Sequence, residues 1–390
     1  MADGREILDT FSLIHKRLRR LESCCVSCNN AFTGVKDGAW DTVPGRRRDD
    51  NWTNPWNNPH CRQVCDTLEY NVNPLFTRTL LAEAPEKPYQ SRNKEFKSVI
   101  HWGQRKLLMS EIEFLTMYGT GDQTVVYAGA APGTHITYLA ELFPTLRFVL
   151  VDPAPFTVKE TDRITIINDL FTDALARQLH DQHERILFVS DIRRADPFQA
   201  GMTSDEVERI IKEDNAMQRG WHTIMEPERS MLKFRLPWDD GRTEYLDGDV
   251  YLPVWGPVTT TETRLITHHK SVQTKWYDNR KYESQMFYFN RVTRPSLFEH
   301  DVRGEGIDHC YDCRAEIHIL SEYLKRCAPA GDISRHVSEM SETISRRIAG
   351  GRTLRDPNPD PEDRRRRIRD RQYKDGMPAH EAKFGKTNVR

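Results

Sequence analysis

Hydrophobic residues are few in this sequence: they make up 37% of its 390 residues, a smaller share than compact domains usually have. No run of 18 apolar residues occurs, so we expect no membrane-spanning helix and no membrane partner. The N-terminal stretch lacks the apolar core of a secretion signal. Together these absences favour a soluble, intracellular protein, part of which is extended or disordered.

The sequence also lacks a sizeable net charge, since the formal charge is −1, but the charges are unevenly spread. Residues 346–390 carry 14 Lys+Arg and 7 Asp+Glu, a net charge of +7, which leaves −8 on the rest of the chain. A basic tail on an acidic body favours an anionic partner or a nuclear address. A solvated, disordered tail is compatible with the same pattern.

Cysteines with the spacing of a standard zinc finger are missing, although the chain has eight cysteines. An intracellular chain keeps them reduced. We favour free or partly buried thiols and expect no metal, although soft ligands do gather in two places. These sets are Cys25, Cys28, His60, Cys61 and Cys65, and further along the chain His309, Cys310 and Cys313.

A G-x-G-x-x-G turn, which a dinucleotide needs, is absent from the most distinctive stretch of the chain. There, a predicted strand at 124–127 leads into the small-residue turn 129–135, a helical pattern and a second strand that ends on Asp152. Such a turn lets a ligand approach the backbone, and an acid at the second tip can accept both hydroxyls of a ribose. Pro132 removes one N–H donor, which favours a less anionic cofactor such as S-adenosylmethionine. A strand–helix–strand unit without a ligand is the alternative.

The elements along the chain alternate in a way that predicts the fold class. Residues 3–22 form an amphipathic helical pattern, and 29–60 are a tryptophan-containing loop. We predict helices over 94–118, 136–143, 173–180, 203–225 and 311–326, and strands over 124–127, 148–151, 164–167, 186–190, 231–236, 249–253, 264–267 and 286–289. This alternation is typical of an α/β, Rossmann-like fold with a doubly wound, mostly parallel sheet. We therefore divide the chain into an N-terminal extension (1–85), a Rossmann-like domain (86–330) and a basic, disordered tail (331–390).

Charged residues stand where ligands bind in such sheets, at the carboxyl ends of strands. Asp152 and Asp191 both occupy this position. Lys233 lies inside an apolar strand, and a desolvated lysine beside a second cation, such as Lys106, loses its proton more easily and can act as a base. Glu262 opens the next strand and can orient that lysine. The alternative is that these groups are separate surface charges.

Five stretches together resemble one family. They are GQRKLL (103–108), YAGAAPGTH (127–135), SDIR (190–193), LKFR (232–235) and ETRL (262–265). In this order they are similar to the poxvirus-type cap-specific mRNA 2′-O-methyltransferases, which occur in large DNA viruses and in trypanosomatids. The resemblance covers about residues 87–295, so it says nothing of the N-terminal extension or the tail.

The resemblance implies a catalytic tetrad of Lys106, Asp191, Lys233 and Glu262. Lys233 would remove the proton of a ribose 2′-hydroxyl, Lys106 would supply positive charge, and the two acids would hold the amine. In-line attack on the sulfonium methyl group of S-adenosylmethionine would follow. The implied cofactor-binding residues are Gln104, Tyr127, Gly129, Gly133, His135, Asp152, Phe171 and Arg193.

The family also stacks a methylated guanine between aromatic side chains and reads its N–H groups with acids. The resemblance places Trp238 and Tyr89 as the two walls and Asp240 and Glu283 as the acids, although the spacing from Tyr89 to Lys106 differs by two residues. The sequence departs from the family at two further positions. Thr259 stands where the family has a tyrosine near the cap, and Ala154 stands where it has an arginine on the cofactor side.

The predicted function is therefore methyl transfer from S-adenosylmethionine to the ribose 2′-hydroxyl of a cap-proximal nucleotide of 7-methylguanosine-capped mRNA. The alternatives are a 2′-O-methyltransferase acting on structured, non-cap RNA and an inactive RNA- or cap-binding subunit. We expect capped mRNA as the partner, and the helix at 3–22 docks on this protein's own body or on a capping-machinery protein. The basic tail favours the nucleus, with a cytoplasmic viral replication site as the alternative.

Overall fold

The computed structural model describes residues 61–63, 71, 73–90, 97–99, 103–194, 203–257, 260–328 and 331–348, all of which belong to the unit Trp52–Arg390. The predicted helix at 3–22, the loop at 29–60 and the basic residues beyond 348 lie outside the described residues. The described helices include none that is long and apolar enough to cross a membrane.

A seven-stranded sheet with the order β5-β4-β3-β6-β7-β10-β9 forms the centre of the fold. The five strands from β5 to β7 are parallel, and β10 runs antiparallel to both β7 and β9. This arrangement confirms the predicted Rossmann-like, mostly parallel sheet. The strands are β3 (Thr124–Ala128), β4 (Arg147–Val151), β5 (Ile164–Ile167), β6 (Ile186–Ser190), β7 (Arg229–Phe234), β9 (Gly248–Tyr251) and β10 (Thr263–Thr267).

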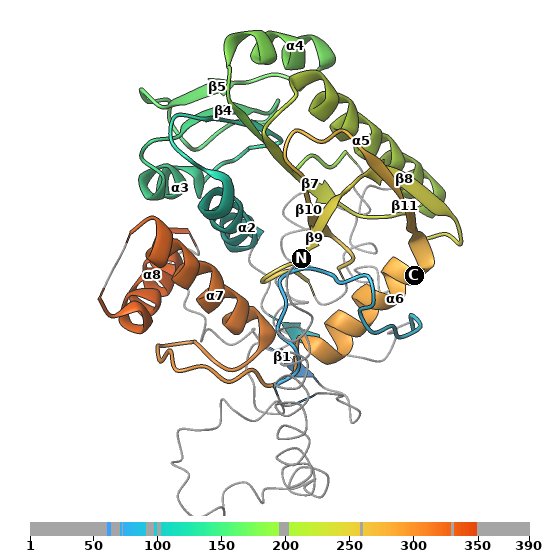
Figure 1. Cartoon of the computed structure of the whole chain (residues 1–390), viewed down its shortest axis with the longest axis vertical. Helices are drawn as coiled ribbons and strands as arrows, with labels where there is room; N and C mark the ends of the chain where they lie inside the picture. Colours follow the sequence, from blue (N-terminus) through green and yellow to red (C-terminus); the bar gives the residue numbers. More distant parts are fainter. Residues whose placement is uncertain are drawn as a thin grey trace, which may run out of the picture. The chain divides into compact units, whose positions relative to one another are not determined.

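Helices cover both faces of this sheet. In Figure 1, α4 and α5 lie on one side of the strands and α2 and α3 on the other. Every residue of β3, β6 and β10 is buried, as is usual for strands that are covered on two faces. The helices are α2 (Gly103–Tyr118), α3 (Ile136–Leu142), α4 (Asp173–Gln182), α5 (Ser204–Met225), α6 (Asn279–Tyr288), the π-helical turn η3 (Phe289–Thr293), α7 (Tyr311–Arg326) and α8 (Ile333–Ile348).

Two small sheets accompany the large one, and the sequence analysis predicted neither. β1 (Cys61–Gln63) pairs antiparallel with β2 (Lys97–Val99), and β8 (Arg242–Leu246) pairs antiparallel with β11 (Thr274–Asp278). The strands of the second pair carry mainly polar and aromatic residues, so they lack the apolar run that marks a buried strand.

The predicted strand at 286–289 is wrong, because these residues end α6 and begin η3. Asp278 caps α6 by accepting a hydrogen bond from the Lys281 N–H, and Met286, Phe287 and Phe289 are buried against the core. An apolar run of four residues has the same composition in a strand and in a buried helix, so the run alone does not separate the two.

Both predicted domain boundaries need correction. The tail predicted from residue 331 is instead helical over α8, which buries Val337 and Ile344. At the other end, residues 73–85 belong with the sheet, because the Leu252 N–H donates a 2.8 Å hydrogen bond to the Arg78 carbonyl and Thr79 forms a bridge with Tyr251 in β9. The compact body therefore extends further in both directions than 86–330.

Candidate active site

Four elements deliver charged side chains to one edge of the sheet. Asp191 follows β6 directly, and Lys233 lies near the carboxyl end of β7. Glu262 precedes β10, and since β10 is antiparallel to β7 its beginning meets the same edge. Lys106 lies in the first turn of α2, not in the middle of a helix as predicted for 94–118, because α2 begins at Gly103.

These four predicted catalytic residues are brought together. The Lys233 Nζ lies 3.1 Å from Asp191 Oδ1 and 3.6 Å from Glu262 Oε2. The Lys106 Nζ lies 2.8 Å from Glu262 Oε1. The side chains are largely but not completely buried, with exposed fractions of 10% for Lys233 and 20% for Glu262. The alternative of separate surface charges does not describe this geometry, although the catalytic roles themselves stay predictions.

Both carboxylates of this cluster are held in the ionised form. Burial alone would oppose the charge, but Lys233 and Arg264 keep the pKa of the Asp191 carboxyl below its usual value. Burial likewise opposes the charge of Glu262, and the positive charges of Lys106 and Lys233 outweigh it, so that its pKa lies well below the ordinary range. The cluster is therefore dominated by its cations.

Arg264 is a fifth member that the sequence analysis did not name. Its Nη2 lies 2.7 Å from Asp191 Oδ1, the oxygen that also contacts Lys233. Its Nη1 lies 3.1 Å from Glu262 Oε1, the oxygen that also contacts Lys106. Arg264 stands opposite Lys233 in the antiparallel pair of β10 and β7, so the register of these strands is the signal that would have found it.

The turn after β3 lies beside this cluster and fits a nucleoside-containing ligand. Gly129 has φ +81°, and a Cβ at this position would lie 3.0 Å from the Ile192 nitrogen, so only glycine lets the turn pack against the residues that follow β6. The Asp191 N–H also donates a 3.0 Å hydrogen bond to the Ala128 carbonyl. Since the strand order reverses between β3 and β6, the turn and Asp191 border the crevice where ligands bind in doubly wound sheets.

Asp152 follows β4 at the same edge, as predicted. Its two oxygens accept backbone hydrogen bonds, Oδ2 from the Ala131 N–H at 3.1 Å and Oδ1 from the Ala154 N–H at 2.8 Å. These bonds orient the carboxylate, and each oxygen retains a further lone pair for a hydroxyl donor. At Ala154, where the related family has an arginine, the chain contributes only its backbone.

Gln104 on α2 and His135 in the turn 129–135 link the turn to α2 by hydrogen bonds. His135 Nδ1 lies 2.7 Å from Gln104 Oε1, and its Nε2 lies 2.9 Å from Glu111 Oε1. The Thr134 hydroxyl donates to the same Gln104 oxygen at 2.6 Å. His135 is buried between two acceptors, so this network holds the predicted cofactor turn onto α2.

Three other predicted cofactor residues take part mainly in packing or ion pairs. Tyr127 is buried in β3, where burial first and Glu111 second raise the pKa of its phenol. Phe171 packs at 4.8 Å between ring centroids on Trp221, within the core. Arg193 lies 3.9 Å from both Asp214 and Glu262, so it adds positive charge at the border of the lysine cluster. Gly133 adopts φ +66° in the turn.

Three of the four predicted cap-binding residues, Tyr89, Asp240 and Glu283, lie on α6 or contact it. Tyr89 packs edge-to-face on Phe287 with ring centroids 5.4 Å apart, and Glu283 lies one helical turn earlier on the same face. Arg280 bridges the two predicted acids, with Nη1 2.7 Å from Glu283 Oε2 and Nε 2.5 Å from Asp240 Oδ1.

Trp238 precedes Asp240 by two residues and is 41% exposed. The Arg235 guanidinium lies 4.2 Å from the centroid of its ring. An exposed indole offers an electron-rich face on which a cationic base can stack. Thr259, the other departure from the family, lies outside the described residues.

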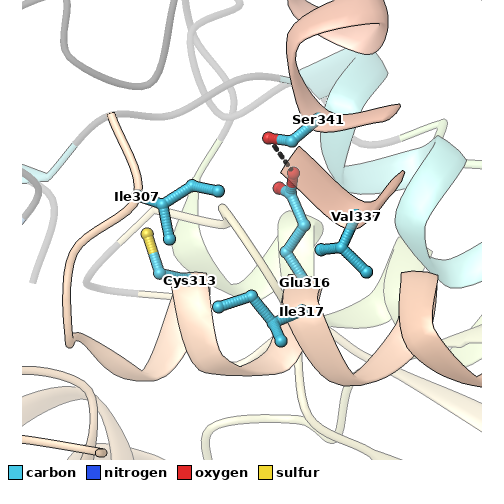
Figure 2. A pocket seen from close by; sticks show the side chains of 6 residues that line it. All are labelled: Ile307, Cys313, Glu316, Ile317, Val337 and Ser341. Carbon is cyan, nitrogen blue, oxygen red and sulfur yellow. Dashed lines mark hydrogen bonds between the residues drawn. The ribbon is translucent and has the colours of Figure 1, made fainter. Parts of the chain in front are cut away.

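A narrow recess lies elsewhere, between α7, α8 and the loop that precedes α7. Figure 2 shows Glu316 and Ser341 hydrogen-bonded across it, at 2.8 Å. Its lining is mostly apolar side chains and includes none of the lysine cluster. The recess therefore does not belong to the candidate active site.

Comparisons with a protein family and with two viral relatives each match more than half of the chain. The poly A polymerase regulatory subunit family matches residues 73–328. The cap-specific mRNA (nucleoside-2′-O-)-methyltransferase of Myxoma virus (strain Lausanne) is 30% identical over 245 residues, which are 57% of this chain and 71% of the relative. The protein of the same name in Fowlpox virus (strain NVSL) is 27% identical over 268 residues, 63% of this chain and 84% of the relative.

Solved structures resemble the chain more distantly. Bluetongue virus VP4, described as a multifunctional RNA-capping production-line, has a TM-score of 0.34 and 12% identity, covering 60% of this chain and 40% of VP4. An antibiotic-related methyltransferase has a TM-score of 0.22 and 10% identity, covering 45% of this chain and 96% of the other.

Proposed function

Because the chain belongs to the poly A polymerase regulatory subunit family, we propose that it is an S-adenosylmethionine-dependent enzyme that methylates the ribose 2′-hydroxyl of a cap-proximal nucleotide in 7-methylguanosine-capped mRNA. The observation that carries this proposal is the convergence of two lysines and two carboxylates beside the glycine turn. An inactive binding subunit would have no need to bury this set of charges.

Lys233 is the base of the proposed reaction. Its amine is oriented by Asp191 Oδ1 and Glu262 Oε2 on the sheet edge. In the proposed reaction this amine is unprotonated before the attack, while Lys106 and Arg264 stay on the same two carboxylates. The amine can then accept the proton of a ribose hydroxyl at the moment the oxygen attacks.

Arg264 keeps the site neutralised while Lys233 changes its charge. A guanidinium does not lose its proton in proteins, and here it contacts both carboxylates at once. When Lys233 is neutral, Asp191 and Glu262 therefore retain a permanent cation, and Lys106 remains on Glu262. This arrangement lets one amine exchange a proton without exposing two buried anions.

The turn 129–135 and Asp152 would hold the cofactor, with Gln104 and His135 fixing the turn. Asp152 would accept the ribose hydroxyls of the cofactor with the lone pairs that its backbone bonds leave. When bound, S-adenosylmethionine supplies an electrophilic methyl group. The chain's own contribution is to place the nucleophile, since alignment accounts for much of the rate of such displacements.

Trp238, Tyr89, Asp240 and Glu283 would recognise the cap. Among the described residues, Arg280 contacts one oxygen of each acid, Asp240 Oδ1 and Glu283 Oε2, and so holds the two carboxylates near each other. The other oxygen of each acid would accept the N–H groups of a 7-methylguanine. The positive charge of that base would favour stacking on the electron-rich face of Trp238.

Transfer of a labelled methyl group tests the proposal directly. We would incubate the full chain with methyl-labelled S-adenosylmethionine and RNAs of one sequence, either capped or uncapped, and map the label. We expect label only on the 2′-oxygen of a cap-proximal nucleotide, and none when that nucleotide is a 2′-deoxynucleotide. Equal labelling of uncapped RNA would identify a non-cap methyltransferase, and RNA binding without transfer would identify an inactive subunit.

Trp238→Ala tests the cap site separately. Loss of stacking on a cationic base should weaken binding of a 7-methylguanosine cap analogue by about tenfold, or roughly 1.4 kcal/mol, as measured by fluorescence titration or calorimetry. Trp276→Ala is the matched control, because Trp276 is a 59% exposed tryptophan on β11. Equal affinities of the two variants would remove Trp238 from the proposed site.

A further inference from the structure

Three side chains that can bind a metal converge where α7 begins. The ligand atoms of Asp308, Cys310 and Cys313 all lie within 4.8 Å of one another, and all three residues are buried. The sequence analysis grouped the two cysteines with His309. The structure replaces this histidine with Asp308, because His309 Nδ1 lies 3.0 Å from the Phe298 carbonyl and its ring stacks on His300.

The backbone brings these groups together through the start of the helix. Cys310 is the N-cap of α7, and its Sγ accepts a hydrogen bond from the Cys313 N–H at 3.4 Å. Asp308 Oδ1 accepts from the Cys310 N–H at 2.8 Å, and the Asp308 N–H donates to Cys313 Sγ at 3.2 Å. The spacing Asp-x-Cys-x-x-Cys thus places one carboxylate and two sulfurs around a common point without distortion of the helix.

The donor set of two sulfurs and one carboxylate is typical of a transition-metal site. Zinc binds thiolate sulfur and carboxylate oxygen, usually with four ligands in a tetrahedron. Calcium and magnesium prefer ligand sets made of oxygen alone, so two cysteines favour zinc.

We propose that Asp308, Cys310 and Cys313 bind a zinc ion that fastens the loop before α7 to the helix. The fourth ligand is a water molecule. Residues 299–310 contain no regular helix or strand, so a metal would supply cohesion that the loop's own backbone does not. The ion has a structural role, because none of its ligands belongs to the lysine cluster.

The zinc site would act on the body through α7. Asp312 and Glu316, which follow the proposed ligands on this helix, hold Arg294 and Arg105. Arg105 is the residue next to Lys106 in α2. Fixing the start of α7 therefore also helps to fix the first turn of α2, which carries Lys106. We therefore expect zinc removal to lower stability first and to affect methyl transfer only through the fold.

Metal content tests the proposal on the full chain. We would purify the protein without chelators, saturate it with zinc, remove loosely bound metal by gel filtration and measure zinc by elemental analysis. We expect about one zinc per chain, lost when Cys310→Ser and Cys313→Ser are combined. Cys327→Ser is the matched control, since Cys327 is an exposed thiol just after α7, and it should retain the metal. Zinc retained by the double variant, or absent from the saturated wild type, would overturn the assignment.

Two measurements keep the test decisive if the double variant does not fold. Wild-type protein loaded with Co²⁺ in place of zinc should show thiolate-to-cobalt charge-transfer absorption, and Asp308→Asn, which keeps both thiols, should bind the ion at least tenfold more weakly. In addition, thiol labelling followed by mass spectrometry should find Cys310 and Cys313 protected by zinc and exposed to reagent after chelation. A cobalt spectrum without thiolate bands, a Cys310–Cys313 disulfide in the native protein, or protection that zinc does not change would each exclude the site.

Discussion

Two regions of this protein bury charge in opposite ways. In the lysine cluster, Asp191 Oδ1 and Glu262 Oε1 are each shared by a lysine and by Arg264. Around α7, by contrast, arginines contact single carboxylates through two nitrogens. These arginine clamps are Arg78–Glu113, Arg105–Glu316 and Arg294–Asp312.

The pKa directions of the acids follow this difference. In the clamps of Arg78 and Arg294, burial outweighs the single arginine, so the pKa values of Glu113 and Asp312 are raised. In the lysine cluster, burial is outweighed by several cations, and the pKa values of Asp191 and Glu262 are lowered. Burial of charge therefore does not identify a reactive site by itself. The lysine cluster differs in that its carboxylates are shared by several cations, one of which is the lysine that we propose as the base.

The largest effect should come from replacing the base. Lys233→Ala should reduce methyl transfer to capped RNA by about 10²- to 10⁴-fold, because a positioned general base contributes this much. Binding of the cofactor, measured by calorimetry, should remain. Lys233→Arg sharpens the test, since it keeps the positive charge but cannot act as a base at neutral pH.

We expect the arginine variant to be as inactive as the alanine variant while recovering stability. Lys275→Ala, at a half-exposed lysine on β11, controls for the loss of one amine and should retain full activity. If Lys233→Arg kept most of the wild-type rate, charge rather than proton transfer would be the role of this residue.

The second largest effect should come from opening a clamp. Arg105 and Glu316 have side chains that are 0% and 3% exposed, so Arg105→Ala leaves a buried carboxylate without its cation. Such losses cost about 3–5 kcal/mol of unfolding free energy. Lys325→Ala breaks an exposed ion pair with Glu322 on the same helix and should cost at most about 1 kcal/mol. Equal losses in chemical denaturation would mean that the clamp contributes no more than a surface pair.

Much of the candidate site was predictable, because the carboxyl ends of parallel strands meet at one edge. Asp152, Asp191 and Lys233 could be placed there from strand order and apolar runs alone. Arg264 was missed because its role depends on the register between β10 and β7, which residue types do not reveal.

The clamps were less predictable than the lysine cluster. Arg105 was assigned to the middle of a helix. α8 was taken as tail although Ile333, Val337, Met340, Ile344 and Ile348 recur at helical spacing and pack against the core beside Ser341 and Ser345. Both serines contact the Arg105 guanidinium at 2.9 to 3.0 Å. A polar anchor of this kind has no hydrophobic period, so it becomes visible only once the partner helix is in place.

The smallest effect, and the sharpest contrast between the regions, should appear in the pH dependence of stability. The folded-state pKa of Glu262 is depressed, so its contribution is present above the ordinary value of 4.5 and is lost as the pH falls through the folded value. The folded-state pKa of Glu113 is raised, so its contribution is present below 4.5 and is lost as the pH rises through the folded value.

Below pH 4.5, Glu262→Gln should therefore make the unfolding free energy rise less steeply with pH than in the wild type. Above pH 4.5, Glu113→Gln should make the unfolding free energy rise more with pH than in the wild type. Urea denaturation at closely spaced pH values measures both slopes, independently of any constant loss of stability that either variant suffers. Glu305→Gln, at an exposed glutamate, controls for the removal of one carboxylate. For each variant, the quantity compared is the change in the slope of unfolding free energy against pH, relative to the wild type. Opposite signs follow only if several cations outweigh burial at Glu262 and the single arginine does not outweigh burial at Glu113. Changes of the same sign for Glu262→Gln and Glu113→Gln would therefore mean that shared and single cations do not set these carboxylates apart.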